Sequence, residues 1–226
     1  MTLSTAARLW WGATALAVVV ALAIQVPLSA GATDDASFPT PLSRVLNLFV
    51  FFTIWSNILV AVVAAGSALG RDLDQVAWRA ARLAGLVAIT VTFAVYNVVL
   101  REPAEPGPGA VANELFHIVV PVLTVVGWVA FGPRGRTSWP VVLWSLALPV
   151  PWTVLTLVRG AVVDGWYPYP FLDVTGLGYP TVLLNVAIVG IAFLALAAGA
   201  HLGDRALRRA ASPQRAAGDP GDRAAT

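Results

Sequence analysis

The feature that most constrains this chain is a series of six long apolar stretches that carry almost no charge. They cover about residues 9–30, 46–69, 83–100, 111–131, 139–158 and 180–202, and Glu114 is the only charged residue within them. A helix needs roughly 17 to 25 mostly apolar residues to cross the hydrocarbon core of a bilayer. Charged residues make up only 12% of the chain, against 58% hydrophobic residues. The sequence therefore predicts an all-α, polytopic membrane protein with six transmembrane helices.

Composition also removes several classes of function. The chain has no cysteine, which excludes disulfides, thiol catalysis and cysteine-ligated metals. Its net charge of +2 is too small, and too concentrated in the C-terminal tail, to argue for binding of nucleic acid. The sequence contains no Walker loop, dinucleotide fingerprint or metalloprotease motif. We therefore expect a protein without metal or cofactor, whose partners are membrane lipids.

The predicted transmembrane domain covers residues 1–203, and the Arg-rich residues 204–226 are expected to form a disordered tail. The first stretch also has features of a secretory signal peptide, since Arg8 precedes an apolar core and Ala30-Gly31-Ala32 offers small residues for cleavage. Its uncharged length exceeds the ~7 to 15 residues usual for the core of a signal peptide. We therefore favour a retained first helix over a cleaved one.

The arginines predict how the helices are oriented, because basic residues of short loops stay on the cytoplasmic side. All fourteen basic residues are arginine, which is typical of a GC-rich bacterial genome. If both termini are cytoplasmic, only Arg44, Arg101 and Arg159 lie outside. The inner set is then Arg8, Arg71, Arg79, Arg82, Arg134, Arg136, Arg205, Arg208, Arg209, Arg215 and Arg223. This asymmetry predicts a multi-pass protein of the cell inner (cytoplasmic) membrane with both termini cytoplasmic.

Polar side chains collect at one level of the predicted bundle. Thr53, Ser56 and Asn57 share one face of the second helix, because residues at i, i+3 and i+4 are neighbours on a helix. At a rise of ~1.5 Å per residue, Thr53, His117 and Asn185 all lie roughly 10 Å below the outer surface. Other helices bring further polar groups towards this level: Thr92, Tyr96, Asn97, Trp152, Thr156 and Arg159. Lipid offers such groups no partner, so we expect a cavity in the outer leaflet.

Within this layer, His117 is the side chain able to exchange a proton near neutral pH, and Thr53 offers a hydroxyl at matched depth. An imidazole can accept the hydroxyl proton while the oxygen attacks an ester carbonyl. Glu114 or Asp173 could orient the imidazole, and side-chain donors could stabilise the oxyanion. The candidates for these supporting roles are Ser56, Asn57, Asn113, Glu114, Arg159, Asp173 and Asn185.

The same residues also have structural explanations. A threonine in a membrane helix usually bonds the carbonyl one turn earlier, and the sequence alone favours that explanation for Thr53. His117 could make an interhelical hydrogen bond. Glu114 and Arg159 are more simply explained as an ion pair near the interface. His201 lies at the cytoplasmic end of the last helix and is expected to be a surface residue.

Three stretches resemble a known family: Phe52-Thr53, Asn113-Glu114-Leu115-Phe116-His117, and Gly165-Trp166-Tyr167-Pro168-Tyr169-Pro170-Phe171-Leu172-Asp173. In order and spacing, from about residue 45 to 200, they are similar to the androgen-induced and androgen-dependent TFPI-regulating membrane proteins and their bacterial relatives. The aromatic stretch that ends Tyr-Pro-Phe-Leu-acid is the most specific of the three.

This resemblance implies a six-helix fold in which an intramembrane threonine and histidine hydrolyse fatty acid esters of hydroxy fatty acids. The matching positions here are Thr53 and His117. The chain departs from the animal members at Ser56-Asn57, where they tend to carry an acidic residue, and at Glu114, where they can carry a second histidine. The fold and catalytic pair therefore transfer more directly than the substrate.

We therefore expect an intramembrane hydrolase of lipid esters, with Thr53 as the nucleophile and His117 as the base. The aromatic loop, which contains Trp166 to Phe171, would cover the cavity and exclude water. The side chains expected to line the substrate are Trp55, Tyr96, Trp166, Tyr167, Tyr169 and Phe171. The alternative is a non-catalytic lipid- or small-molecule-binding membrane protein, such as a transporter or sensor. A transporter more often shows paired interrupted helices in repeated halves, and the sequence shows no such repeat.

Overall fold

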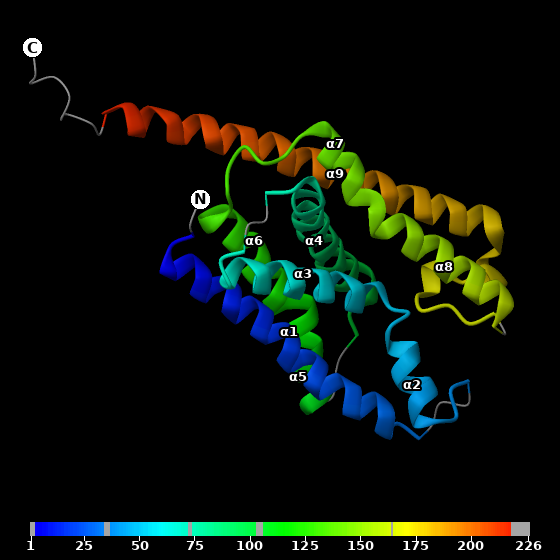
Figure 1. Cartoon of the computed structure of the whole chain (residues 1–226). Coiled ribbons are helices and arrows are strands. Elements are labelled where there is room, and N and C mark those ends of the chain that lie inside the picture. Colours follow the sequence, from blue (N-terminus) through cyan, green and yellow to red (C-terminus); the bar gives the residue numbers. More distant parts are fainter. Residues whose placement is uncertain (1–2, 34–36, 72–73, 103–105, 164, 218–226) are drawn as a thin grey trace, which may run out of the picture.

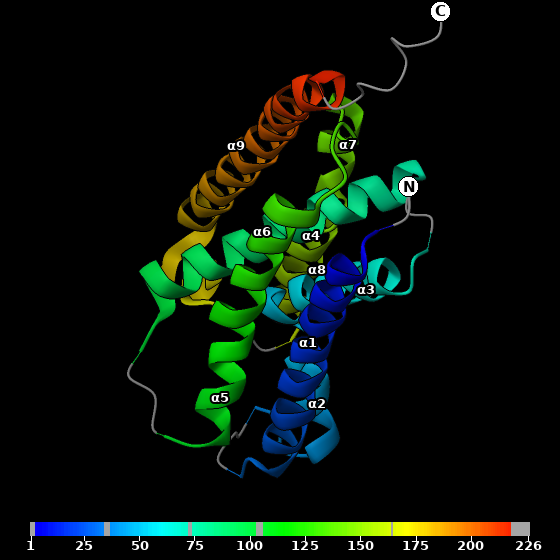
Figure 2. The same cartoon turned by 90° about the vertical axis from the view of Figure 1, so that its left-hand side faces the viewer.

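The computed structural model describes residues 3–33, 37–71, 74–102, 106–163 and 165–217. Within these ranges every regular element is a helix and no strand is formed (Figures 1 and 2). Five helices are long and apolar enough to cross a membrane, and the number rises to six if a pair of helices bent by 68° is counted as one broken span. The prediction of an all-α, multi-pass membrane protein is confirmed.

Most of the spans are interrupted rather than continuous. The α-helices are α1 (Thr5–Gly31), α2 (Pro41–Leu48), α3 (Phe52–Ala68), α4 (Val76–Val95), α5 (Pro108–Glu114), α6 (Val120–Phe131), α7 (Trp139–Trp144), α8 (Pro149–Val162) and α9 (Val174–Ala217). Two π-helical segments, η1 (Tyr96–Leu100) and η2 (Leu115–Val119), and two 3-10 segments, η3 (Ser145–Ala147) and η4 (Pro170–Leu172), lie between them. The six apolar stretches of the sequence fall on α1, α2–α3, α4–η1, α5–η2–α6, α7–η3–α8 and α9.

The helix α4 is the most buried span and lies at the centre of the bundle (Figure 1). Its Val87 belongs to one buried apolar cluster with Phe193 of α9. On the other side, Ile89 belongs to a cluster with Val18 of α1 and Val60 of α3. Between membrane helices, where lipid is as apolar as the side chains, such close packing is a main source of association. The central helix therefore holds the two halves of the bundle together.

A glycine brings α1 and α6 unusually close. Trp10 of α1 donates its indole N–H to the backbone oxygen of Leu123 at 2.9 Å. A Cβ at Gly127 would lie 2.6 Å from the indole nitrogen of Trp10, so any larger residue there would push the helices apart. The first helix thus forms part of the packed bundle and is fixed to it by a directional bond.

The second span is broken at residues 49–51, where a continuous helix over 46–69 was expected. Phe51 has an extended ψ of 130°, and α3 begins at the next residue. Trp152 donates its indole N–H to the oxygen of Val50 at 2.8 Å, and Trp55 donates to that of Phe49 at 2.6 Å. Buried backbone carbonyls need such partners where no helix supplies them. The prediction of an unbroken helix is wrong, because the indoles of two tryptophans bond carbonyls that the break leaves without a helical partner.

Proline accounts for the interruption in the fourth span. Pro121 lacks an N–H, and its ring collides with the carbonyl four residues earlier, that of His117. The backbone widens into η2 immediately before this point, and the N–H of Val120 bonds the carbonyl of Leu115, five residues back. The expected continuous helix over 111–131 therefore contains a π-turn, and His117 lies in the middle of it.

The last helix extends further than the sequence indicated. It begins at Val174, and Gly178 interrupts its first turns with a φ of 74°, a left-handed conformation that favours glycine. The backbone then stays helical to Ala217, so the disordered tail expected from residue 204 is wrong as far as residue 217. The remainder of that tail, residues 218–226, lies outside the described residues.

Asp204 anchors this extension by capping the connection between α6 and α7. Its carboxylate accepts hydrogen bonds from the N–H of Gly135 at 3.0 Å and from the hydroxyl of Thr137 at 2.8 Å. Because that hydroxyl gives its proton to Asp204, it accepts a bond from Nδ1 of His201, 2.9 Å away. Asp204 and His201 are 1% and 4% exposed. The expectation that His201 is a surface residue is wrong, since the α6–α7 connection folds over it.

Replacing Asp204 with alanine should destabilise the protein by about 2 to 3 kcal/mol, because buried donors of Gly135 and Thr137 lose their acceptor. Thermal unfolding in detergent measures this. Glu102→Ala removes an exposed carboxylate and should change the free energy of unfolding by less than about 0.5 kcal/mol. Equal melting temperatures for the two variants would contradict the role of Asp204.

Candidate active site

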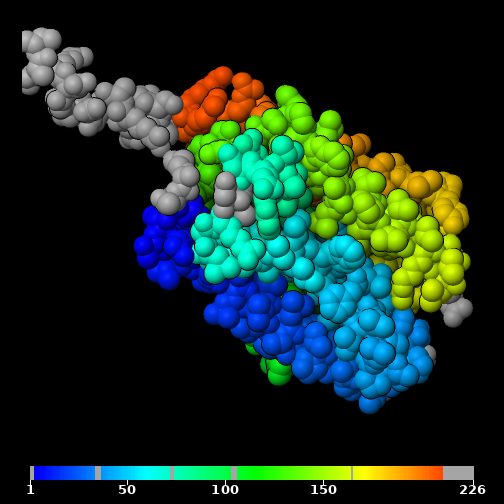
Figure 3. Space-filling view, viewed as in Figure 1, coloured from blue at the N-terminus to red at the C-terminus, as the bar shows by residue number. Residues whose placement is uncertain are grey.

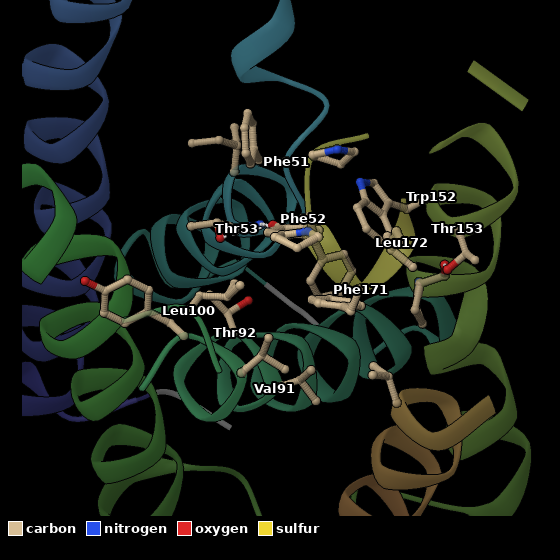
Figure 4. A pocket seen from close by; sticks show the side chains of 18 of the residues that line it. Phe51, Phe52, Thr53, Val91, Thr92, Leu100, Trp152, Thr153, Phe171 and Leu172 are labelled. Atoms are coloured by element: carbon tan, nitrogen blue, oxygen red, sulfur yellow. Dashed lines mark hydrogen bonds between the residues drawn. The ribbon is translucent and has the colours of Figure 1, made fainter. Parts of the chain in front are cut away.

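A cavity of about 910 Å³ lies between α3, α4 and α8, with further walls from the other spans (Figure 4). Its lining is mostly aliphatic and aromatic, and it includes Leu183, Val186 and Val189 of α9. The polar side chains that line it are Gln25, Ser29, Arg44, Asn47, Thr53, Thr92, Tyr96, Asn113, His117, Thr153 and Tyr169. A volume of this order is typical of sites that enclose a ligand of drug or lipid size.

Thr53 and His117 meet in this cavity. The hydroxyl oxygen of Thr53 lies 3.3 Å from Nε2 of His117. On the other side of the ring, Nδ1 lies 3.0 Å from the backbone oxygen of Asn113. A carbonyl can only accept, so Nδ1 carries the proton of the neutral imidazole and Nε2 presents its lone pair to Thr53. The geometry therefore fixes the tautomer in which His117 can accept the hydroxyl proton.

The irregular backbone described above positions both side chains. The break at residues 49–51 puts Thr53 in the first turn of α3, and η2 turns His117 towards it. Tyr96 of η1 stacks on the imidazole with 3.9 Å between ring centroids and 18° between the planes. The side-chain amide of Asn113 donates to the hydroxyl of Tyr96. Asn113 thus supports the pair twice, through its carbonyl on His117 and its amide on Tyr96.

Tyr169 is a third polar group at this point, and sequence reasoning placed it only in the lining. Its hydroxyl oxygen lies 3.3 Å from the backbone nitrogen of Thr53 and 3.4 Å from the Thr53 hydroxyl. The ring packs edge-on against Phe51 and stacked on Phe171. The sequence gives no signal for this contact, because it depends on how residues 165–173 fold back over the bundle.

Ser56 and Asn57 hold the first turn of α3 instead of facing the cavity. Ser56 donates to the backbone oxygen of Thr53 at 3.0 Å or shares its proton with the Thr92 hydroxyl at 2.9 Å. The amide of Asn57 donates to the backbone oxygen of Thr53 at 2.8 Å and to that of Phe116 at 3.3 Å. Both side chains are fully buried. Their expected role as oxyanion donors is therefore wrong, and they fix the backbone that carries Thr53.

The expected ion pair between Glu114 and Arg159 is also wrong. Glu114 forms a salt bridge of 3.0 Å with Arg101. Arg159 lies on α8, on the opposite side of the bundle from α5 (Figure 1), where it donates to Asn47 at 3.1 Å. Its guanidinium also lies 5.0 Å from the ring centroid of Trp166. Neither residue reaches His117 or Thr53, so Glu114 does not orient the imidazole and Arg159 is not an oxyanion donor.

Asp173 and Asn185 likewise act on the backbone. The carboxylate of Asp173 accepts from the N–H groups of Thr175 and Gly176 and caps the first turn of α9. The hydrogen bond from the Thr175 hydroxyl is the largest cause that holds the pKa of Asp173 below its usual value. Asn185 donates to the carbonyl of Phe171 at 2.9 Å. These contacts shape the loop over the cavity, and no acidic side chain in the described part of the chain bonds His117.

Of the six aromatic residues expected to line the substrate, four line the cavity: Tyr96, Trp166, Tyr169 and Phe171. Trp55 is 40% exposed and turns away to bond the Phe49 carbonyl. Tyr167 packs over Gly160, where a Cβ would lie 2.0 Å from its ring. These two predictions are wrong, because Trp55 bonds a carbonyl at the helix break and Tyr167 packs the loop against α8.

Arg159 of α8 bonds Asn47 of α2, and Figure 3 shows these two helices next to each other on the surface.

Among the residues that the structure describes, no three His, Asp or Glu side chains gather in an arrangement that could hold a metal ion. Comparison of the chain with protein-family models, with curated proteins and with solved structures finds no match. The arrangement of the cavity and its polar groups is therefore the basis for assigning a function.

Arg159→Gln should loosen the aromatic loop, because it removes the cation–π contact with Trp166 and weakens the bond to Asn47. A loss of about 1 to 3 kcal/mol of local stability should speed hydrogen exchange of the 165–172 backbone roughly tenfold or more. Arg101→Gln removes the half-exposed salt bridge to Glu114 and should leave hydrogen exchange of the 165–172 backbone unchanged. Identical exchange in the Arg159 variant and the parent would show that the contact does not hold the loop.

Proposed function

We propose that this protein hydrolyses lipid esters within the membrane, with Thr53 as nucleophile and His117 as general base. The observation that carries the proposal is the 3.3 Å approach of the Thr53 hydroxyl to Nε2 of His117, on a ring whose other nitrogen donates to a backbone carbonyl. A hydroxyl beside an unprotonated imidazole nitrogen, inside an apolar cavity, is the arrangement that nucleophilic acyl transfer needs.

In the proposed reaction, Nε2 takes the proton of the Thr53 hydroxyl as the oxygen bonds to the acyl carbon. The tetrahedral intermediate then collapses, and the imidazolium returns the proton to the departing alcohol oxygen. Water next attacks the acyl-threonine ester, gives a proton to Nε2 and releases the fatty acid while Thr53 recovers its proton. The carbonyl of Asn113 accepts the hydrogen bond from Nδ1–H throughout and keeps the orientation of the imidazole ring fixed.

The oxyanion would form at the start of α3. The backbone N–H of Thr53 donates to the Tyr169 hydroxyl, and a helix N-terminus carries a partial positive charge. Burial raises the pKa of Tyr169, so its hydroxyl stays protonated and can donate to the developing oxygen anion. We propose that the substrate oxygen takes a place between this amide and this hydroxyl.

The cavity fits an acyl chain better than a polar substrate. Its walls on α4, α8 and α9 are aliphatic, and the aromatic loop closes the end at which Thr53 lies. The excess of arginines at the opposite end supports an inner-membrane protein with cytoplasmic termini, and in that orientation this cavity would lie in the outer leaflet. A lipid would then enter sideways from the bilayer. The activity is the one implied by the resemblance to the androgen-induced and androgen-dependent TFPI-regulating proteins.

One observation favours the alternative of a non-catalytic lipid-binding protein. Among the described residues, the group that bonds Nδ1 of His117 is a neutral carbonyl, whereas an acidic partner would stabilise the imidazolium that forms during the reaction. A transporter or sensor could use the same cavity and needs no such stabilisation. The two functions differ in whether turnover depends on Thr53.

Purified protein given a panel of fluorogenic lipid esters should hydrolyse at least one of them. Thr53→Ala and His117→Ala should each lower kcat/KM by roughly a thousandfold or more, and the double variant should lose little beyond either single change. Tyr169→Phe should lower kcat by about tenfold to a hundredfold if its hydroxyl stabilises the oxyanion.

Thr90→Ala is the matched control, because Thr90 bonds the carbonyl of Leu86 and does not line the cavity. Its activity should stay within about twofold of the parent. Full activity in folded Thr53 and His117 variants would refute the catalytic pair. A parent protein that binds lipid esters at this cavity but hydrolyses none of them would favour the binding protein.

A further inference from the structure

A second cavity, of about 980 Å³, lies at the other end of the bundle. Ser67, near the end of α3, lines it, whereas Thr53 stands at the start of the same helix. Ser67 follows Thr53 by fourteen positions, so at ~1.5 Å per residue the two residues lie roughly 20 Å apart along the helix. The proposed hydrolysis makes no use of this cavity.

Its lining is strongly basic. Six arginines line the cavity: Arg8, Arg71, Arg82, Arg134, Arg136 and Arg208. They come from α1, α4, α9 and two connections, so the fold gathers them from distant parts of the chain. Asp74 is the one acidic residue among the described residues of the lining. Like charges brought together this closely repel one another unless an anion lies between them.

Asp74 does not neutralise the group. Its two carboxylate oxygens pair with Arg79 and with Arg136. Arg71, Arg82 and Arg134 form no salt bridge with any residue that the structure describes. Guanidinium groups are always charged at physiological pH, so among the described residues these three carry positive charge that no salt bridge neutralises.

Arg134 is the clearest example of an arginine in this cavity whose charge has no acidic partner among the described residues. Its Nη1 is buried and has no hydrogen-bond partner among the described residues. The rest of the guanidinium is fixed, since Nη2 donates to the carbonyl of Val129 and the group lies 5.3 Å from the ring centroid of Trp128. A buried charged donor without an acceptor is costly. A positioned donor of this kind, in a cavity lined by five other arginines, is suited to bind an anion.

The inner part of the same cavity is apolar. Trp11, Val60, Val63 and Leu86 line it, between α1, α3 and α4. A ligand that fits both the arginine-lined part and the apolar part of the cavity has two portions. One is a compact, highly charged anionic group that binds the arginines, and the other is an apolar group that packs against the inner wall. Guanidinium forks match phosphate oxygens in pairs, and a dianionic phosphate monoester balances several arginines better than a carboxylate does.

We propose that this cavity binds a phosphate monoester group, held by Arg82 and Arg134 and screened by the other arginines. The phosphate can come from the headgroup of an anionic membrane lipid or from a soluble phosphate. The apolar inner wall favours the lipid, whose acyl chain would lie against Val60 and Leu86. The site is separate from the Thr53–His117 cavity and does not depend on its activity.

The test uses the full-length protein in neutral detergent, with binding followed by tryptophan fluorescence, since Trp11 and Trp128 line the cavity. The probes are dihexanoyl phosphatidic acid, dihexanoyl phosphatidylcholine and inorganic phosphate. Arg82→Gln and Arg134→Gln should each weaken binding of the phosphatidic acid about tenfold or more. Arg205→Gln, which removes the same charge from an exposed position on α9 outside the cavity, should change it by less than about twofold.

Unliganded melting temperatures establish that each variant is folded, and Arg71→Gln replaces any variant that is not. Phosphatidic acid as the tightest probe supports a lipid headgroup, and inorganic phosphate binding equally well supports a soluble phosphate at the same site. Equal binding of zwitterionic phosphatidylcholine would overturn the proposal, because the apolar wall alone would then explain it. Equal losses in the Arg205 control, or no binding of any phosphate probe to the parent, would overturn it as well.

Discussion

Within a bilayer every backbone N–H and C=O must find a partner in the protein, and the site of this molecule depends on how one break in a helix meets that requirement. At residues 49–51 the second span stops and turns by 68°. The indoles of Trp152 and Trp55 bond the carbonyls of Val50 and Phe49, which the turn releases. Because the helix restarts at Phe52, Thr53 lies in the first turn of α3.

A second irregularity completes the site. The π-turn before Pro121 carries His117, and another π-turn carries Tyr96, whose ring stacks on the imidazole. Inserted π-turns re-aim side chains without ending a helix, and they occur often at functional sites. The imidazole is oriented by a carbonyl of its own helix, that of Asn113, so its tautomer is set by backbone geometry. This differs from the acid-oriented histidines of many soluble hydrolases.

The helix α3 joins two cavities of opposite character. At its start an apolar cavity encloses a hydroxyl and an imidazole, and at its end an arginine-lined cavity demands an anion. Asn57 and Ser56 stiffen the first end by bonding the Thr53 carbonyl, while Arg8 bonds the carbonyl of Ala68 at the second. Asn57 also bonds the carbonyl of Phe116, so both ends of α3 are tied to other helices of the bundle.

The sequence alone determined what depends on composition and local spacing. Apolar length predicted the all-α membrane fold, and the polar layer selected Thr53 and His117 before any contact was known. Only the tertiary structure decided which groups meet. Glu114 pairs with Arg101 rather than with Arg159, and the Tyr169 hydroxyl reaches Thr53 across 116 positions.

The physical reason is that depth along a helix follows from counting residues, whereas rotation about the helix axis does not. A π-turn, a broken helix or a folded-back loop changes that rotation and so changes the partner of every polar side chain beyond it. Buried His201 and Asp204 illustrate the same limit, because nothing in their own segment indicates the connection that covers them. Length and charge fixed the spans, and packing between distant segments fixed the chemistry.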